Sequence, residues 1–163
     1  MVKHFLLESP IGVLTLVKTD GVLSGLYMGV SSNSAVAFGL RASSGFEDVV
    51  EQLREYFGQS RTAFTVPISL EGTSFQKRVW AELVNIPYGE TRSYGQLADA
   101  IGNRSAVRAV GAANGRNPIS IIVPCHRVIG SNGTLVGYGG GLERKRFLLG
   151  LEQAARPTEV RLF

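Results

Sequence analysis

The chain has 163 residues, of which 44% are hydrophobic, and its 17 basic and 13 acidic side chains give a net charge of +4. This length holds one large domain or two small ones, and the basic excess favours an anionic partner. The single cysteine excludes an internal disulfide framework and fits a reducing cytosol. No apolar run is long enough to span a membrane, and the start is too short and too charged for a signal peptide. We therefore expect a cytoplasmic protein without membrane contacts.

The first third of the chain predicts β-structure. Three short apolar runs, at 2–8, 11–17 and 21–29, are separated by turn residues, and Asp20-Gly21 is a hairpin signal. Residues 30–45 are rich in Ser, Gly and Ala, and are typical of a loop or a poor helix.

An amphipathic helix is predicted over 46–57, where apolar side chains recur at helical spacing until Gly58. Residues 63–70 indicate an extended segment, and Pro67 suggests the edge of a sheet. This half would be a small α/β unit that ends near residue 70, and nothing in it looks catalytic.

The pattern becomes helical after residue 72. Thr73 or Ser74 can cap a helix that ends before Pro87-Tyr88-Gly89. Its predicted core face consists of Phe75, Val79, Trp80, Leu83 and Val84.

Two short helices then predict a helix-turn-helix. Ser93 can cap the first, the turn lies at 102–104, and Ser105 opens the second, which runs to about Asn114. Further on, Ser131-Asn132-Gly133 indicates a hairpin between Val128-Ile129 and Leu135-Val136. A last helix is predicted over 142–151, and its inward residues would be Leu142, Phe147, Leu148 and Leu151.

The second helix of this pair is built almost entirely from small residues, with Arg108 as the exception. A helix that reads the major groove normally carries long polar side chains on its exposed face. A smooth helix can instead approach a narrow minor groove or pack closely inside the protein, and the small residues alone favour packing. In the first case Arg108 could enter the base stack, where its guanidinium would stack and donate hydrogen bonds.

Cys125 is either a buried apolar filler or a nucleophile. His126 follows it directly, and a thiol needs such a base because free cysteine has a pKa of roughly 8.5. Adjacent strand residues point to opposite faces, so the two could cooperate only across a turn or through a bridging water. An orienting acid could be Glu143 or Glu152. One cysteine and two histidines are too few for a zinc site, and we expect no metal and no cofactor.

Several motifs in the second half resemble the O6-alkylguanine-DNA alkyltransferases. The five-residue segment from Pro124 to Val128 is the most specific of them. The others are Asn117-Pro118, 137–141, 86–91, Ser93-Tyr94 and 108–111. The likeness is strong over 73–152 and looser over 1–70. It implies a ribonuclease-H-like α/β domain at 1–70, followed by a helical domain with a helix-turn-helix at 71–163.

The resemblance also implies roles for individual residues. Cys125 would accept the alkyl group, His126 would act as a base through a water, and Glu152 rather than Glu143 would orient His126. Asn117 would support the turn of the active site, and Tyr94 would press on the phosphate 3′ of the target. The remaining DNA contacts would come from Arg108 as an intercalating finger and from Ser93, Ala106, Ala109, Gly111 and Ala112. The flipped base would be held by Tyr138, Gly139, Val136 and Val128.

The activity that follows from the resemblance is DNA repair by direct reversal. The protein would bind double-stranded DNA through the minor groove and flip out the damaged base. It would then transfer the alkyl group of O6-alkylguanine, and of O4-alkylthymine, irreversibly and stoichiometrically to Cys125. The partner would be DNA that contains O6-alkylguanine, and the protein would be a monomer able to bind DNA cooperatively.

Overall fold

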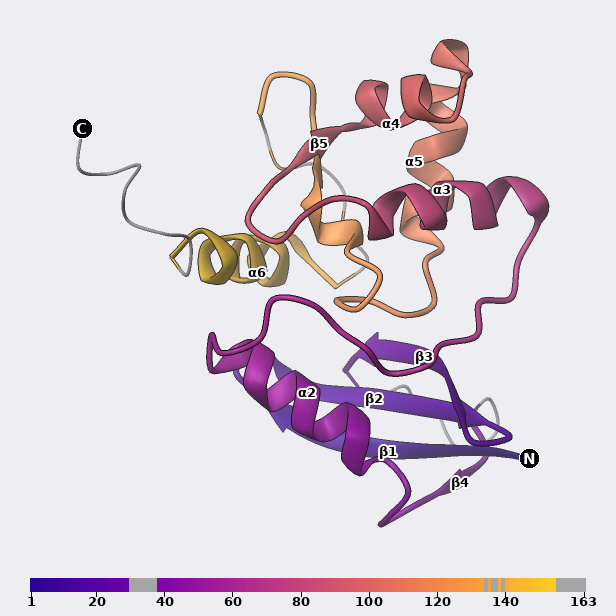
Figure 1. The fold of residues 1–163 in the computed structure, drawn as a ribbon, viewed down its shortest axis with the longest axis vertical. Helices are drawn as coiled ribbons and strands as arrows, with labels where there is room; N and C mark the ends of the chain where they lie inside the picture. The colour runs from indigo at the N-terminus through magenta and orange to yellow at the C-terminus, as the bar shows by residue number, and fades with distance from the viewer. Residues whose placement is uncertain (30–37, 134, 136–137, 139, 155–163) are drawn as a thin grey trace.

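The computed structural model describes residues 1–29, 38–133, 135, 138 and 140–154, which form a sheet half and a helical half (Figure 1). The sheet half holds β1 (Val2–Ser9), β2 (Gly12–Thr19), β3 (Val22–Met28) and β4 (Leu40–Arg41) in the order β3-β2-β1-β4. The first three strands pair antiparallel, whereas β4 runs parallel to β1.

Tight turns and one covering helix explain why this half folds as predicted. Asp20 and Gly21 take positive φ values of 50° and 84°, which a two-residue hairpin between right-twisted strands requires. Helix α2 (Glu47–Phe57) packs onto the sheet and, with the strands, buries the N-terminal part of the hydrophobic core. The predicted strands and helix are confirmed to within two residues. The buried residues of α2 are Val49, Val50, Leu53 and Tyr56.

Residues 58–73 connect the two halves. Ile68 forms a single parallel bridge with Leu23 of the edge strand β3, and the Ser69 amide donates to the Leu23 carbonyl at 2.8 Å. The predicted extended segment therefore lies at the sheet edge, but it contributes one bridge rather than a full strand.

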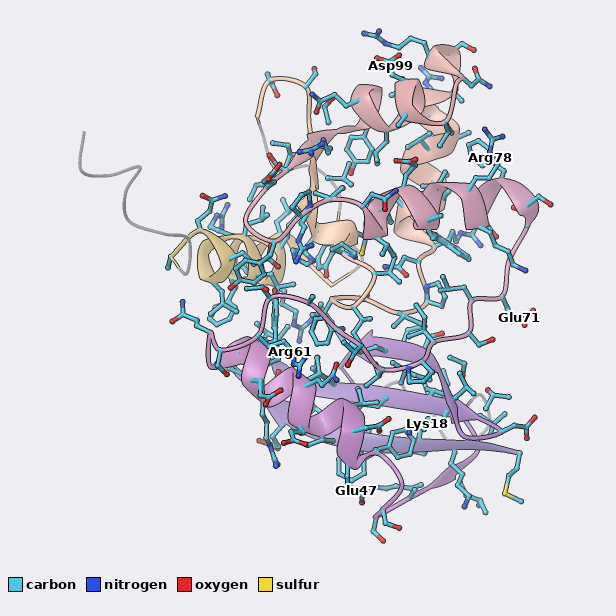
Figure 2. The ribbon with its side chains drawn as sticks, in the orientation of Figure 1. Lys18, Glu47, Arg61, Glu71, Arg78 and Asp99 are labelled. Atoms are coloured by element: carbon cyan, nitrogen blue, oxygen red, sulfur yellow. The ribbon has the colours of Figure 1, made fainter. Side chains whose placement is uncertain are left out.

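The helical half contains α3 (Ser74–Val84), α4 (Tyr94–Ala100) and α5 (Val107–Gly115), followed by α6 (Leu142–Ala154). Thr73 and Ser93 both form capping boxes, because each side chain accepts from the amide three residues on and that residue's glutamine bonds back. Short strands β5 (Arg92–Ser93) and β6 (Val128–Ile129) pair in parallel. Figure 2 shows Arg78 and Asp99 on the side of this half that points away from the sheet.

Two predictions about helices α3 and α5 are wrong. Val84 is 53% exposed, because it follows the inward-facing Leu83 by one residue and so points about 100° away from it. Ser105 does not cap α5: its hydroxyl donates to the Asn103 side chain, and the 3-10 turn η1 (Arg104–Ala106) precedes the helix instead.

After Val128, one prediction is not covered by the described residues and another, on the inward face of α6, is partly wrong. Val128–Ile129 pairs with Arg92–Ser93. The predicted return strand of the hairpin includes Val136, which lies outside the described residues, so this hairpin stays a prediction. On α6, Leu142 and Phe147 are exposed, by 42% and 40%. The inward face of α6 carries polar groups instead. Its buried residues are Lys145, Leu148 and Glu152.

Backbone and side-chain hydrogen bonds join the two halves. The Leu26 amide of β3 donates to the Pro118 carbonyl at 2.9 Å, and the Ser120 amide donates back to Leu26 at 3.1 Å. Arg144 of α6 donates from Nε to the Ile11 carbonyl at 2.9 Å. The sheet half thus contacts the segment that leads to Cys125.

Among the described helices, none is long and apolar enough to cross a membrane.

Candidate active site

Cys125 lies on a 3-10 turn, η2 (Cys125–Arg127), rather than on a strand. Pro124 precedes the turn, and its carbonyl accepts from the Arg127 amide at 3.0 Å. Ile121, four residues before the thiol, holds a φ of +71°, which a β-branched residue rarely adopts. Such a backbone costs roughly 1–3 kcal/mol and persists only where its surroundings enforce it. The thiol therefore sits on a tightly constrained loop.

Two buried asparagines hold this loop in place. Asn117 donates from Nδ2 to the Val123 carbonyl at 2.7 Å and accepts from the Ile119 amide at 3.0 Å. Asn114 of α5 donates to the carbonyl of Cys125 itself at 3.4 Å. The loop is thereby fixed to the C-terminal end of α5.

The next residue, His126, is fully buried and faces α6. Its Nε2 lies 2.7 Å from Oε2 of Glu152. An ionised carboxylate only accepts, so this bond assigns the ring proton to Nε2 and leaves Nδ1 as an acceptor. Within the described residues Nδ1 is buried and has no hydrogen-bond partner. It is therefore available to a water or to a proton.

Glu152 is the centre of a buried cluster, the Glu152 network, which consists of Glu152, Tyr56, His126, Arg127 and the Gly89 amide. Arg127 donates to both carboxylate oxygens, from Nε at 2.8 Å and from Nη2 at 3.1 Å. The Gly89 amide donates at 3.4 Å, and the Tyr56 hydroxyl at 2.6 Å. Burial raises the pKa of Glu152, but its bonds and charge contacts with His126 and Arg127 outweigh this and lower the pKa to about 2. Glu152 is therefore an anion.

Electrostatics leave the thiol and the imidazole uncharged at rest. Burial raises the pKa of Cys125, although a hydrogen bond from Asn117 and the charge of Lys145 oppose the shift. Burial lowers the pKa of His126 despite the nearby Glu152. A thiol beside a neutral base can be activated at the moment of reaction.

A cavity of about 560 Å³ opens beside the thiol. Tyr94 of α4 faces it, and burial, followed by the Cys125 charge, raises the pKa of this tyrosine, so that it keeps its proton. The sheet half contributes Tyr27 and Met28 to the wall. The other lining residues are Gly111, Asn114, Gly115, Arg116, Asn117, Ser120, Cys125, Tyr138 and Gly140.

The helix-turn-helix is formed by α4, η1 and α5, and it flanks this cavity. Arg108, Ala109 and Ala112 are exposed on α5, whereas Ala106 and Gly111 are half-buried. A Cβ on Gly111 would lie 3.8 Å from the Tyr94 ring, which is an ordinary van der Waals distance, so this position faces α4. Both interpretations of the smooth helix therefore apply, because one face packs and the other is open.

The structure brings together most of the residues that the sequence singled out. Cys125, Asn117, Tyr94 and Tyr138 line one cavity, and His126 contacts Glu152, while Glu143 is exposed. Val128 is fully buried outside the cavity wall, and Ser93 caps α4. Val136 and Gly139 lie outside the described residues.

Sequence reasoning missed the contribution of the sheet half. Tyr56 reaches the site from α2, and Tyr27 and Met28 reach it from β3. The only available signal was that a tyrosine on a buried helix face needs a partner for its hydroxyl. That signal does not name the partner, which is 96 residues away in the sequence.

Comparison with known proteins gives matches over both halves. Residues 2–70 match the ribonuclease-like domain of 6-O-methylguanine DNA methyltransferase, and residues 74–154 match its DNA-binding domain. A methylated-DNA–protein-cysteine methyltransferase of Mycobacterium bovis is 51% identical, with 100% of this chain and 99% of the relative covered. One of Methanosarcina acetivorans is 48% identical, with 91% and 97% covered.

Solved structures agree with these sequence matches. The O6-methylguanine methyltransferase of Mycobacterium tuberculosis superposes with a TM-score of 0.90 at 51% identity and covers 100% of this chain and 99% of its own. The Mycobacterium tuberculosis OGT in complex with DNA gives a TM-score of 0.87 at 51% identity, with 99% of each chain covered.

Proposed function

The chain belongs to the 6-O-methylguanine DNA methyltransferase family, and on that premise we propose that it moves the alkyl group of O6-alkylguanine in DNA to Cys125. It is an enzyme of direct-reversal DNA repair, and DNA is its partner. The observation that supports the assignment to Cys125 is its setting: the single thiol of the chain lines the cavity beside the helix-turn-helix, and the next residue pairs with a buried carboxylate.

The geometry supports a displacement in which His126 removes the thiol proton. Nδ1 of His126 accepts that proton through a water while Glu152 stabilises the imidazolium. The sulfur attacks the alkyl carbon, the bond from that carbon to O6 breaks, and the departing guanine takes a proton. Tyr94, which keeps its proton and lines the same cavity, supplies it. The product is a thioether, so each molecule reacts once.

DNA is engaged through the minor groove. The open face of α5 carries Ala109 and Ala112, which allow close approach with little base readout. Arg108 fills the space left by the flipped base, and Tyr94 presses on the 3′ phosphate. Flipping costs a few kcal/mol, which these contacts and the cavity offset. This DNA-contacting surface also includes Ser93, Ala106 and Gly111, and it does not need to read the base sequence.

The cavity would hold the flipped base. Tyr138 and Gly140 lie on its wall, and Asn117 holds the Cys125 loop in place through its bond to the Val123 carbonyl. Gly139 and Val136 would continue this wall. Val128 would act indirectly, because its buried carbonyl accepts from Lys145 at 2.5 Å behind the loop.

Further parts of the proposal concern scope and organisation. O4-alkylthymine would be a second substrate, and no metal or cofactor would take part. The protein would act in the cytoplasm as a monomer that can bind DNA cooperatively. Its two domains would divide at residues 70 and 71, within the segment that connects the sheet to α3.

One experiment tests the proposal. The protein is incubated with duplex DNA that contains a single O6-methylguanine, and its intact mass is then measured. We expect a gain of one methyl group per molecule, located on the peptide that carries Cys125. Continued turnover of excess DNA, or intact binding without a change in mass, would contradict it.

A further inference from the structure

We propose that Tyr56, on helix α2 of the sheet half, is a positioning residue for the reaction, because its hydroxyl fixes the carboxylate that orients His126. The inference rests on the proposed function. It adds a residue from the half of the chain in which the sequence predicted no chemistry.

The contact is short, buried and direct. The Tyr56 hydroxyl donates to Oε2 of Glu152 at 2.6 Å, and the same oxygen accepts from Nε2 of His126 at 2.7 Å. All three side chains are fully buried. Burial and then the Glu152 charge raise the pKa of Tyr56, so that it remains a donor at every relevant pH.

The bond fixes how the carboxylate is turned. Oε1 of Glu152 accepts from Arg127 Nε and from the Gly89 amide, while Oε2 accepts from Tyr56, from His126 and from Arg127 Nη2. Donors on both oxygens lock the rotation of the carboxylate about its last bond. The imidazole of His126 is thereby held with Nδ1 free to accept.

The bond also limits the pull of Glu152 on the His126 proton. Three donors, from Tyr56, His126 and Arg127, share the electron density of Oε2, so removal of the Tyr56 hydroxyl leaves that oxygen more basic. The imidazolium form of His126 is then stabilised further, and His126 holds its proton to a higher pH.

Other groups around the pair act on the same proton. Around Glu152 and His126, the titratable and charged side chains are Tyr56 on α2, Tyr88 after α3, Cys125 and Arg127 on η2, and Lys145 on α6. Tyr88 provides a matched control. Its ring packs edge-on against Tyr56, with centroids 6.2 Å apart, and within the described chain its buried hydroxyl has no hydrogen-bond partner.

The first measurement is independent of activity. Nitrogen NMR of histidine-labelled protein reports the tautomer and the titration of His126, and a His4→Asn variant assigns the signals of the two histidines. We expect Tyr56→Phe to move the His126 titration to higher pH by roughly half a unit or more. Tyr88→Phe should leave it in place.

The second measurement is the rate of reaction with free O6-benzylguanine as a function of pH. The acidic limb should move upward in Tyr56→Phe by a similar amount and should not move in Tyr88→Phe. Leu53→Ala, one turn earlier on α2, controls for lost stability because it destabilises the helix core without touching Glu152.

The outcomes separate the two proposals. An unshifted His126 titration in Tyr56→Phe, whatever its melting temperature, would overturn the positioning role, and so would an equal shift in Leu53→Ala. If the wild-type protein itself takes up no alkyl group, the proposed function fails, while the NMR titration still decides whether Tyr56 controls His126.

Discussion

The two halves of the molecule bury different kinds of side chain. Of the eight buried polar or charged residues in the described part of the chain, only His4 and Thr15 belong to the sheet half. The other six lie in the helical half, and four of them lie on the turn that carries Cys125 or on the inward face of α6. Those four are His126, Arg127, Lys145 and Glu152.

This difference shows how the molecule divides stability from chemistry. Burying charged groups costs free energy that pairing recovers only in part, whereas apolar burial stabilises without such a cost. The sheet half therefore supplies a firm apolar support. The helical half holds its charges through contacts such as the bond from Tyr56 to Glu152. Its buried charges and the positive φ of Ile121 both cost stability.

Removal of the Cys125 thiol is expected to have the largest effect, because it eliminates the chemistry of the helical half. Cys125→Ala should abolish alkyl transfer completely, because no other cysteine is present, while DNA binding through α5 continues. Intact mass after exposure to O6-methylguanine DNA measures the first, and a binding titration the second. Loss of binding together with transfer would show that the thiol loop and the DNA surface are not separable.

A cavity in the sheet half should weaken the fold and spare the chemistry. Leu53 is fully buried on α2, so Leu53→Ala should lower the free energy of unfolding by about 2–5 kcal/mol. Urea unfolding measures this loss. The rate with free O6-benzylguanine below the melting range should stay within about twofold of wild type, since no contact of the Glu152 network is removed. A large fall in rate would show that the apolar core of the sheet half and the chemistry of the helical half are not independent.

Substitution of Arg108 tests whether base flipping in duplex DNA depends on the helical half. Arg108→Ala should slow the repair of duplex DNA by roughly tenfold or more, because the vacated base stack is no longer filled. Reaction with the free base needs no flipping and should change little. Single-turnover rates on both substrates measure the ratio, and equal slowing would argue against the finger role. Arg104→Ala, an exposed arginine paired with Asp99, is the matched control.

Sensitivity to acid should originate in the helical half. The folded pKa of His126 lies below its ordinary 6.5, so as pH falls through 6.5 the unfolded chain binds a proton that the folded chain does not. Stability is therefore lost as pH falls, at up to about 1.4 kcal/mol per pH unit. Below about pH 4.5 Glu152 adds a further loss, because its folded pKa is about 2. Urea unfolding between pH 5 and 8 should show a smaller slope for His126→Asn, and an unchanged slope would contradict this origin.

Local sequence signals predicted the elements well where the chain makes its own turns and caps. Asp20-Gly21 gave the hairpin, and Thr73 and Ser93 gave the starts of α3 and α4, because a turn or a capping box depends on residues a few positions apart. Ser105 has the same chemistry but bonds to Asn103 instead, since the preceding turn presents another partner.

Apolar periodicity was less reliable for α6. Counting hydrophobic residues predicted Leu142 and Phe147 inside, whereas the buried face carries Lys145 and Glu152. The sequence pattern assumes that buried side chains are apolar, and a site built from paired charges violates that assumption.

The sequence by itself determined the identity of the reactive groups: one thiol, an adjacent histidine, and motifs that resemble one family. Only the tertiary structure decided how these groups cooperate. It turned Cys125 onto a 3-10 turn, brought Glu152 within 2.7 Å of His126, and added Tyr56 from the other half. The physical reason is that residue types and short motifs are local properties, whereas the basicity of the buried His126 depends on distant residues that only folding brings together. Glu152 is 26 residues from His126, and Tyr56 is 96 residues from Glu152.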